Sequence, residues 1–164
     1  MEIAKTIEVL NSLIIINNDR IEGYETASKE TEEFDLITMF AQFISTGQKC
    51  KIELALEVNT LGGEVAESIM TSGKFFQEYM DFMAALSGND RKIILNSCEY
   101  GEDKALDAYD NALENDLDYL SAEQQTMIIA QRSLLKADHS HVKALRDAMP
   151  VINHDKQNCS NLIN

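Results

Sequence analysis

The sequence predicts an all-α protein, an antiparallel four-helix bundle, and three observations support this. Four long segments repeat apolar residues at spacings of three and four, the pattern of an amphipathic helix. The 164 residues include one proline and 7 glycines, too few for the tight turns of a β sandwich or barrel. Apolar residues make up 45% of the chain and charged residues 26%, the balance of a globular protein. We therefore expect one helical domain over residues 1–149.

The first two helices are predicted over residues 4–29 and 35–61. Gly62 and Gly63 end the second helix, because glycine readily adopts the left-handed conformation that closes a helix. The acidic link between the two helices is short, so they should lie antiparallel. The inner stripe of the first helix consists of Ile7, Leu10, Ile14, Asn17, Ile21 and Tyr24, and that of the second of Leu36, Met39, Phe40, Phe43, Gly47, Cys50, Leu54, Val58 and Leu61.

A long connection over residues 64–90 is predicted to contain a short helix at about residues 74–86. Its large apolar side chains recur at helical spacing, so we expect them to pack against the bundle rather than to line a ligand groove. The polar residues 87–90 end this helix and offer caps for the next. The apolar residues of the short helix are Phe75, Phe76, Tyr79, Phe82, Met83 and Leu86.

The last two helices are predicted over residues 91–115 and 122–149, with Ser121 and Gln124 forming a capping box at the start of the last one. Residues 150–164 have no apolar periodicity and are expected to be a loose tail. Two short links separated by one long crossover are the connectivity of ferritin-like bundles, whereas an up-and-down bundle needs three short links. The predicted layout is therefore ferritin-like.

Charge argues against several classes of partner. The formal charge of -14, with no cluster of basic residues, would repel nucleic acid and anionic membrane surfaces. The longest apolar run, residues 13–16, is far short of the roughly 20 residues that span a bilayer. No signal-peptide pattern is present, so we expect a cytoplasmic protein. The three cysteines form no CxxC pair and are expected to be reduced thiols.

Four motifs occur in a characteristic order along the chain. They are NNDRIEGYE at residues 17–25, LGGE at 61–64, CEYGEDKALDAY at 98–109 and HSHVKALRD at 139–147. Together they resemble an uncharacterised bacterial family of ferritin-like four-helix bundles, the domain of unknown function 2383. The resemblance spans about residues 7–148 and implies the ferritin-like fold. It implies no particular activity, because the family has no established reaction.

Ferritin-like di-iron proteins need a Glu from each of two helices and a Glu-x-x-His pair from each of the other two. The chain does not meet this pattern. The residue three positions before His139 is Lys136, a cation that would oppose a metal. Asp138 and His141 keep the three-residue spacing, but with Asp in place of Glu.

The direction of each acidic residue follows from an advance of about 100° per residue along a helix. On this count Glu102 and Asp138 lie near the middle of their inner stripes, whereas Glu53, Glu99 and His139 lie on the flanks. A charge buried alone is costly, so the two inner acids must pair, protonate, meet water or bind a cation.

Two interpretations of function lead, and a small-molecule pocket between the crossover and the bundle is a third that stays open. The first is a noncatalytic bundle that acts through a protein partner or through self-association, for example as a homodimer, with a hydrogen-bonded or water-filled polar layer at mid-length. It requires no cofactor. The alternative is a metal-binding, stress-related protein of the di-iron or manganese type. Its candidate ligands are Glu102, Asp138 and His141, assisted by Glu99, His139 and Glu53.

Overall fold

The computed structural model describes residues 2–69 and 73–150, with side chains omitted for residues 73–79. Within these ranges the chain forms α1 (Ile3–Glu30), α2 (Phe34–Thr60), α3 (Gly73–Ser87), α4 (Arg91–Asn115), a 3-10 turn η1 (Leu117–Tyr119) and α5 (Ala122–Asp147). The predicted helices are confirmed in number, order and approximate position. Of the predicted loose tail, residues 151–164 lie outside the described residues. None of the described helices is both long and apolar enough to cross a membrane.

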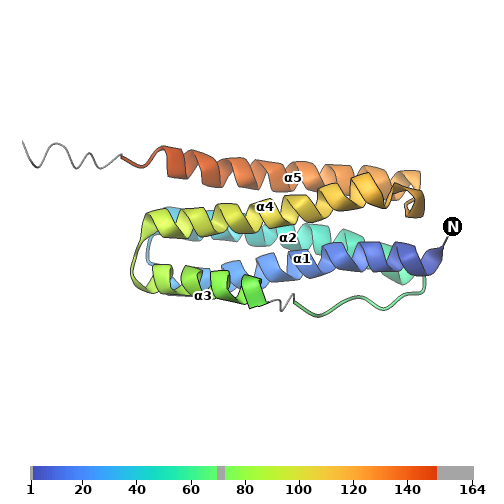
Figure 1. The fold of residues 1–164 in the computed structure, drawn as a ribbon, viewed down its shortest axis with the longest axis horizontal. Coiled ribbons are helices and arrows are strands. Elements are labelled where there is room, and N and C mark those ends of the chain that lie inside the picture. The colour runs from blue at the N-terminus through green and yellow to red at the C-terminus, as the bar shows by residue number, and fades with distance from the viewer. Residues whose placement is uncertain (1, 70–72, 151–164) are drawn as a thin grey trace, which may run out of the picture.

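The four long helices form an antiparallel bundle with one crossover (Figure 1). α1 packs antiparallel to α2, and α4 packs antiparallel to α5. The connection after α2 runs back along the bundle to α3, which packs against α1 and α4. As a result α2 and α4 run in the same direction, so the predicted ferritin-like connectivity is confirmed.

The helix ends form where the sequence predicts them. Gly62 has a φ of +77°, and the N–H of Gly63 donates to the carbonyl oxygen of Val58 at 2.9 Å, which closes α2. The side chain of Ser121 accepts a hydrogen bond from the backbone N–H of Gln124, whose side chain accepts one from the backbone N–H of Ser121, so the capping box of α5 is confirmed.

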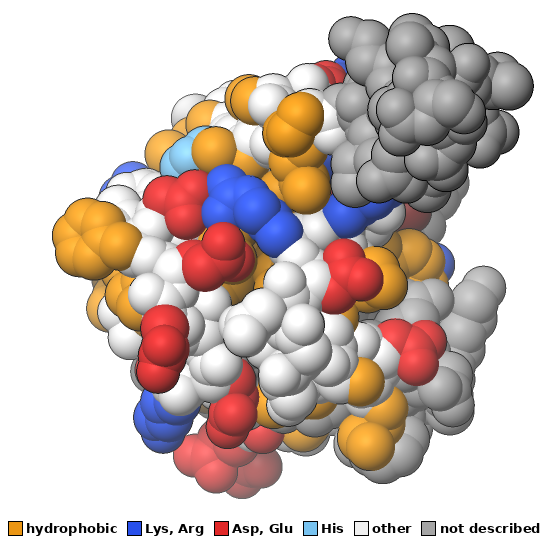
Figure 2. All heavy atoms as spheres, turned by 90° about the vertical axis from the view of Figure 1, so that its left-hand side faces the viewer, with side chains coloured by type: hydrophobic (Ala, Val, Ile, Leu, Met, Phe, Trp, Pro, Cys, Tyr) orange, Lys and Arg blue, Asp and Glu red, His pale blue; other side chains and the backbone are white. Residues whose placement is uncertain are grey.

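Ion pairs join the helix ends at one end of the bundle. Arg91, at the start of α4, contacts Glu33 at 3.4 Å and Asp35 at 2.6 Å, both near the link between α1 and α2. Figure 2 looks onto this end, where acidic and basic side chains lie side by side on the surface. These partly exposed pairs connect the two halves of the chain, although each contributes only about 0–1 kcal/mol.

The core consists of two apolar clusters with polar residues between them. The short helix α3 contributes Phe82, Ala85 and Leu86 to one cluster, so its predicted packing against the bundle is confirmed for these side chains. Phe75, Phe76 and Tyr79 lie outside the described side chains. Buried polar residues at mid-length separate the clusters, and they include Asn17, Arg20, Thr46, Glu102, Gln131 and Asp138.

Helices α1 and α2 approach each other closely at Gly47, beside this polar zone. A Cβ atom on Gly47 would lie 2.9 Å from Cγ1 of Ile21 and 3.5 Å from Nη1 of Arg20. The absence of a side chain at this position therefore makes room for the side chains of α1.

Replacing Gly47 with alanine is expected to destabilise the protein by about 1 kcal/mol. Overpacking costs about 1–3 kcal/mol, whereas alanine gains only about 1 kcal/mol of helix propensity over glycine. Gly101→Ala is the matched control, because a Cβ there would meet no atom within 4 Å. The control should gain about 1 kcal/mol in urea denaturation. Equal stability of the two variants would contradict a close contact at Gly47.

Candidate functional site

Arg20 of α1 forms a buried ion cluster with acidic residues of the two helices that follow the crossover. Its Nε lies 3.0 Å from Oε1 of Glu102, and its Nη2 lies 3.2 Å from Oε2 of the same carboxylate. The same Nη2 lies 3.1 Å from Oδ2 of Asp138. Arg20 is 5% exposed and Glu102 is fully buried. One guanidinium therefore joins α1 to both α4 and α5, with the two-pronged geometry that favours Arg–carboxylate pairs.

Tyr24 extends this cluster by one helical turn. Its hydroxyl donates a hydrogen bond of 2.7 Å to Oε1 of Glu102. Burial raises the pKa of Tyr24 well above its ordinary value, and the negative charge of Glu102 raises it further. Tyr24 is therefore a protonated donor at neutral pH. It supplies the hydrogen bond that a buried carboxylate needs beyond its ion pair.

The ion cluster carries more negative than positive charge. Arg20 binds Glu102 through two of its nitrogen atoms, and it also binds Asp138. Two carboxylates therefore share one cation. Burial raises the pKa of Asp138, and Glu102 raises it further, against the opposing effects of Arg20 and of a hydrogen bond from Thr46. Burial alone would lower the pKa of Arg20, but the charge and hydrogen bonds of Glu102, together with electrostatic interactions with Tyr24 and Asp138, outweigh it, so the guanidinium stays charged.

A second polar layer lies next to the ion cluster and includes one residue from each bundle helix. Nδ2 of Asn17 donates to the Tyr109 hydroxyl oxygen at 2.9 Å, and that hydroxyl donates to Oε1 of Gln131 at 2.7 Å. Nε2 of Gln131 donates to the carbonyl oxygen of Cys50 at 3.3 Å. This chain of hydrogen bonds satisfies buried groups at one level of all four helices.

Neither described cysteine has the properties of a nucleophile. Burial raises the pKa of the Cys50 thiol to about 11. Burial and the charge of Glu102 raise the pKa of Cys98 still more. Both side chains are thus protonated thiols at neutral pH, and a protonated thiol is a poor nucleophile. Their role in the fold is that of small core residues.

The candidate metal ligands from the sequence do not converge on a single point. Glu102 and Asp138 meet at Arg20. Glu53 accepts a 3.4 Å hydrogen bond from Gln131 in the neighbouring layer. The ring of His141 instead lies edge-on to Phe43, with 6.1 Å between the ring centroids.

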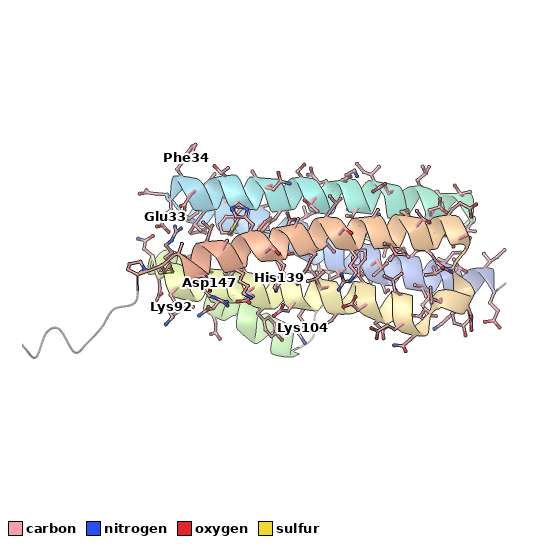
Figure 3. All side chains as sticks on the ribbon, turned by 90° about the horizontal axis from the view of Figure 1, so that it is seen from above. Glu33, Phe34, Lys92, Lys104, His139 and Asp147 are labelled. Carbon is pink, nitrogen blue, oxygen red and sulfur yellow. The ribbon has the colours of Figure 1, made fainter. Side chains whose placement is uncertain are left out.

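Glu99 and His139 come together with Asp103 at the outer junction of α4 and α5. One ligand atom from each of the three lies within 4.8 Å of the others. Nε2 of His139 lies 2.6 Å from Oδ1 of Asp103, and Arg146 pairs with Glu99. Figure 3 shows His139 where α5 lies beside α4. We call these three residues the outer cluster.

A family comparison covers most of this architecture. The family model described as Domain of unknown function (DUF2383) matches residues 5–115, which include most of α1 and all of α2, α3 and α4. The chain belongs to the DUF2383 family. The family resemblance inferred from the sequence motifs is therefore confirmed, and α5, with Asp138 and His139, lies beyond the matched residues. No characterised protein matches the chain at a significant level.

A ferritin-like metal pair would need a particular set of donors at the centre of this DUF2383 protein. Such a pair uses four carboxylates and two histidines that converge on two cations. Among the residues that the structure describes, two carboxylates converge here, and both bind the guanidinium of Arg20. A metal ion at this position would face a fixed positive charge and compete for the same oxygens. The donors present at the centre do not fit a metal pair.

Sequence reasoning identified Glu102 and Asp138 as inward-facing but did not identify Arg20 or Asp103. The signal for Arg20 was available, because it lies three residues after Asn17 and four before Tyr24, both on the inner stripe. Asp103 carries no such signal. Its role depends on which residue of α5 lies opposite.

The variant Asp138→Asn is expected to gain stability relative to the wild type as the pH rises. A pKa raised in the folded state means that the stabilising contribution of Asp138 is complete below about 3.8 and is lost as pH rises through the folded-state pKa. Asparagine does not titrate. Urea denaturation of both proteins between about pH 4 and pH 7 measures the difference.

Asp35→Asn is the control, because the pKa of Asp35 is shifted in the opposite direction. Arg91 lowers the pKa of Asp35 through a side-chain hydrogen bond, so this residue loses its stabilising contribution only as pH falls below about 3.8. The difference in stability between Asp35→Asn and the wild type should stay constant between about pH 4 and pH 7, the range in which that of Asp138→Asn changes. A wild-type advantage over Asp138→Asn that grows with pH would contradict the raised pKa.

Proposed function

We propose that this DUF2383 protein is a noncatalytic helical bundle that acts by self-association, as a homodimer joined through the outer face of α2. The observation that carries the proposal is a pair of large apolar side chains on that face. Ile52 and Leu56 are 69% and 65% exposed, and they lie four residues apart, on one side of the helix. Exposed apolar side chains grouped on one face mark interaction sites.

The charge distribution favours a second copy of the same chain as the partner. With a formal charge of -14, two copies repel each other over most of their surfaces. Residues 36–52 of α2 contain no Asp or Glu, although the chain has 28 acidic residues. Two copies that meet along α2 therefore approach where repulsion is weakest. Figure 3 shows α2 along one edge of the bundle, where a second molecule has access.

An antiparallel contact between the two copies of α2 would suit this face. A twofold axis near Ile52 brings Ile52 against its own symmetry mate, and it brings Leu56 against the alkyl part of Lys49 from the other copy. Glu53 is the one acidic residue between Lys49 and Leu56 in the sequence, and its carboxylate accepts a hydrogen bond from Gln131 of α5. The face is thus self-complementary in the way a twofold interface requires.

The polar centre supports the noncatalytic part of the proposal. Glu102 and Asp138 are engaged by Arg20, and the tyrosine and cysteine side chains around them have raised pKa values. Such groups are fixed by structure and poorly suited to exchange protons or attack a substrate near neutral pH. The central groups thus hold the helices in place, while the outer face of α2 makes the contacts with a partner.

Sedimentation velocity of the wild type and of the double variant Ile52→Glu/Leu56→Glu tests self-association. At about 100 μM the wild type should sediment as a dimer if the Kd is about 10 μM or below. The double variant should sediment as a monomer with unchanged helical circular dichroism, because four glutamates would meet in the interface. Added salt should strengthen the wild-type dimer by screening its net charge.

Ile129→Glu is the matched control, since Ile129 is 54% exposed but belongs to α5. This variant should remain a dimer. A monomeric wild type at the same concentration would overturn the proposal, and so would a double variant that still forms the dimer.

A further inference from the structure

We propose that the outer cluster of Glu99, Asp103 and His139 is a binding site for one divalent transition-metal ion, with Zn²⁺ as the best match. Glu99 and Asp103 lie four residues apart on α4 and so share one side of that helix. His139 reaches them from α5. The site therefore joins the two helices from outside the core, separate from the ion cluster on Arg20.

The distances suit a single ion after small side-chain movements. The three ligand atoms lie within 4.8 Å of one another, and Nε2 of His139 is already 2.6 Å from Oδ1 of Asp103. Zinc binds nitrogen and oxygen ligands at about 2.0–2.2 Å, so two ligands of one ion are at most about 4.4 Å apart. A rotation of the carboxylates brings all three atoms within this limit.

Burial makes one ligand fixed and leaves another adjustable. The side chain of His139 is 12% exposed, whereas that of Asp103 is 56% exposed. The imidazole is thus held by packing, and the Asp103 carboxylate is free to turn toward an ion. An imidazole with two carboxylates is a donor set that suits zinc, and three protein ligands leave the remaining position to water.

Arg146 competes with the metal for one of these ligands. Its guanidinium pairs with Glu99 and, at 3.5 Å, with Asp147. Binding of an ion therefore requires Glu99 to exchange Arg146 for the metal.

 The exchange predicts that removing the charge of Arg146 strengthens metal binding, an effect that a purely structural role of these side chains would not produce.

Isothermal titration calorimetry with ZnCl₂ on the untagged full chain tests the site. The wild type should bind one Zn²⁺ per chain, and His139→Gln and Asp103→Asn should each weaken binding by about tenfold or more. Arg146→Gln should strengthen it about fivefold, because an opposing charge is removed from a partly exposed site. Zinc should also raise the melting temperature of the wild type, since a ligand that binds only the folded state stabilises it.

His141→Gln is the matched control, because His141 lies two residues away on α5 and contacts Phe43. This variant should bind zinc as the wild type does. Equal weakening by His141→Gln and His139→Gln would overturn the proposal, as would the absence of zinc binding or an Arg146→Gln variant with unchanged affinity. Circular dichroism of each variant checks that the helices are intact.

Discussion

Burial of one guanidinium between two carboxylates costs several kcal/mol of desolvation per ion. Close ion pairs and hydrogen bonds to the buried groups offset this cost. Arg20 makes three hydrogen bonds to Glu102 and Asp138, and Tyr24 donates a fourth to Glu102. These contacts join three of the four long helices at a single level. Gly47 lies beside these contacts, and its missing side chain leaves space for Arg20.

The ion cluster also determines what the ferritin-like fold can do in this protein. In a di-metal protein of this fold, inward carboxylates gather around exchangeable cations. Here the cation is a side chain, covalently attached to α1 and therefore permanent. The adjacent layer of Asn17, Tyr109 and Gln131 is likewise linked by hydrogen bonds within the protein. A fold shared with metalloproteins thus carries, in this protein, a centre in which an arginine side chain pairs with the inward carboxylates.

The sequence was sufficient for the fold and for part of the site. Apolar stripes, glycine stops and the Ser121 cap predicted the helices and their connectivity, because these features act within single helices. Helical facing also identified Glu102 and Asp138 as inward residues. It did not reveal their partner, since an arginine is usually assigned to the surface and its long side chain reaches partners on other helices. The outer cluster was harder still, because the meeting of Asp103 with His139 depends on the register between α4 and α5, which periodicity does not determine.

A double-mutant cycle between Arg20→Met and Glu102→Gln, measured by urea denaturation, tests the central role of the ion cluster most directly. Removing Arg20 alone should cost about 3–5 kcal/mol, because it leaves two buried carboxylates without their cation. The double variant should be less destabilised than the sum of the single variants by at least about 2 kcal/mol. Additive effects of the two substitutions would contradict the account, because they would show that Arg20 and Glu102 do not depend on each other.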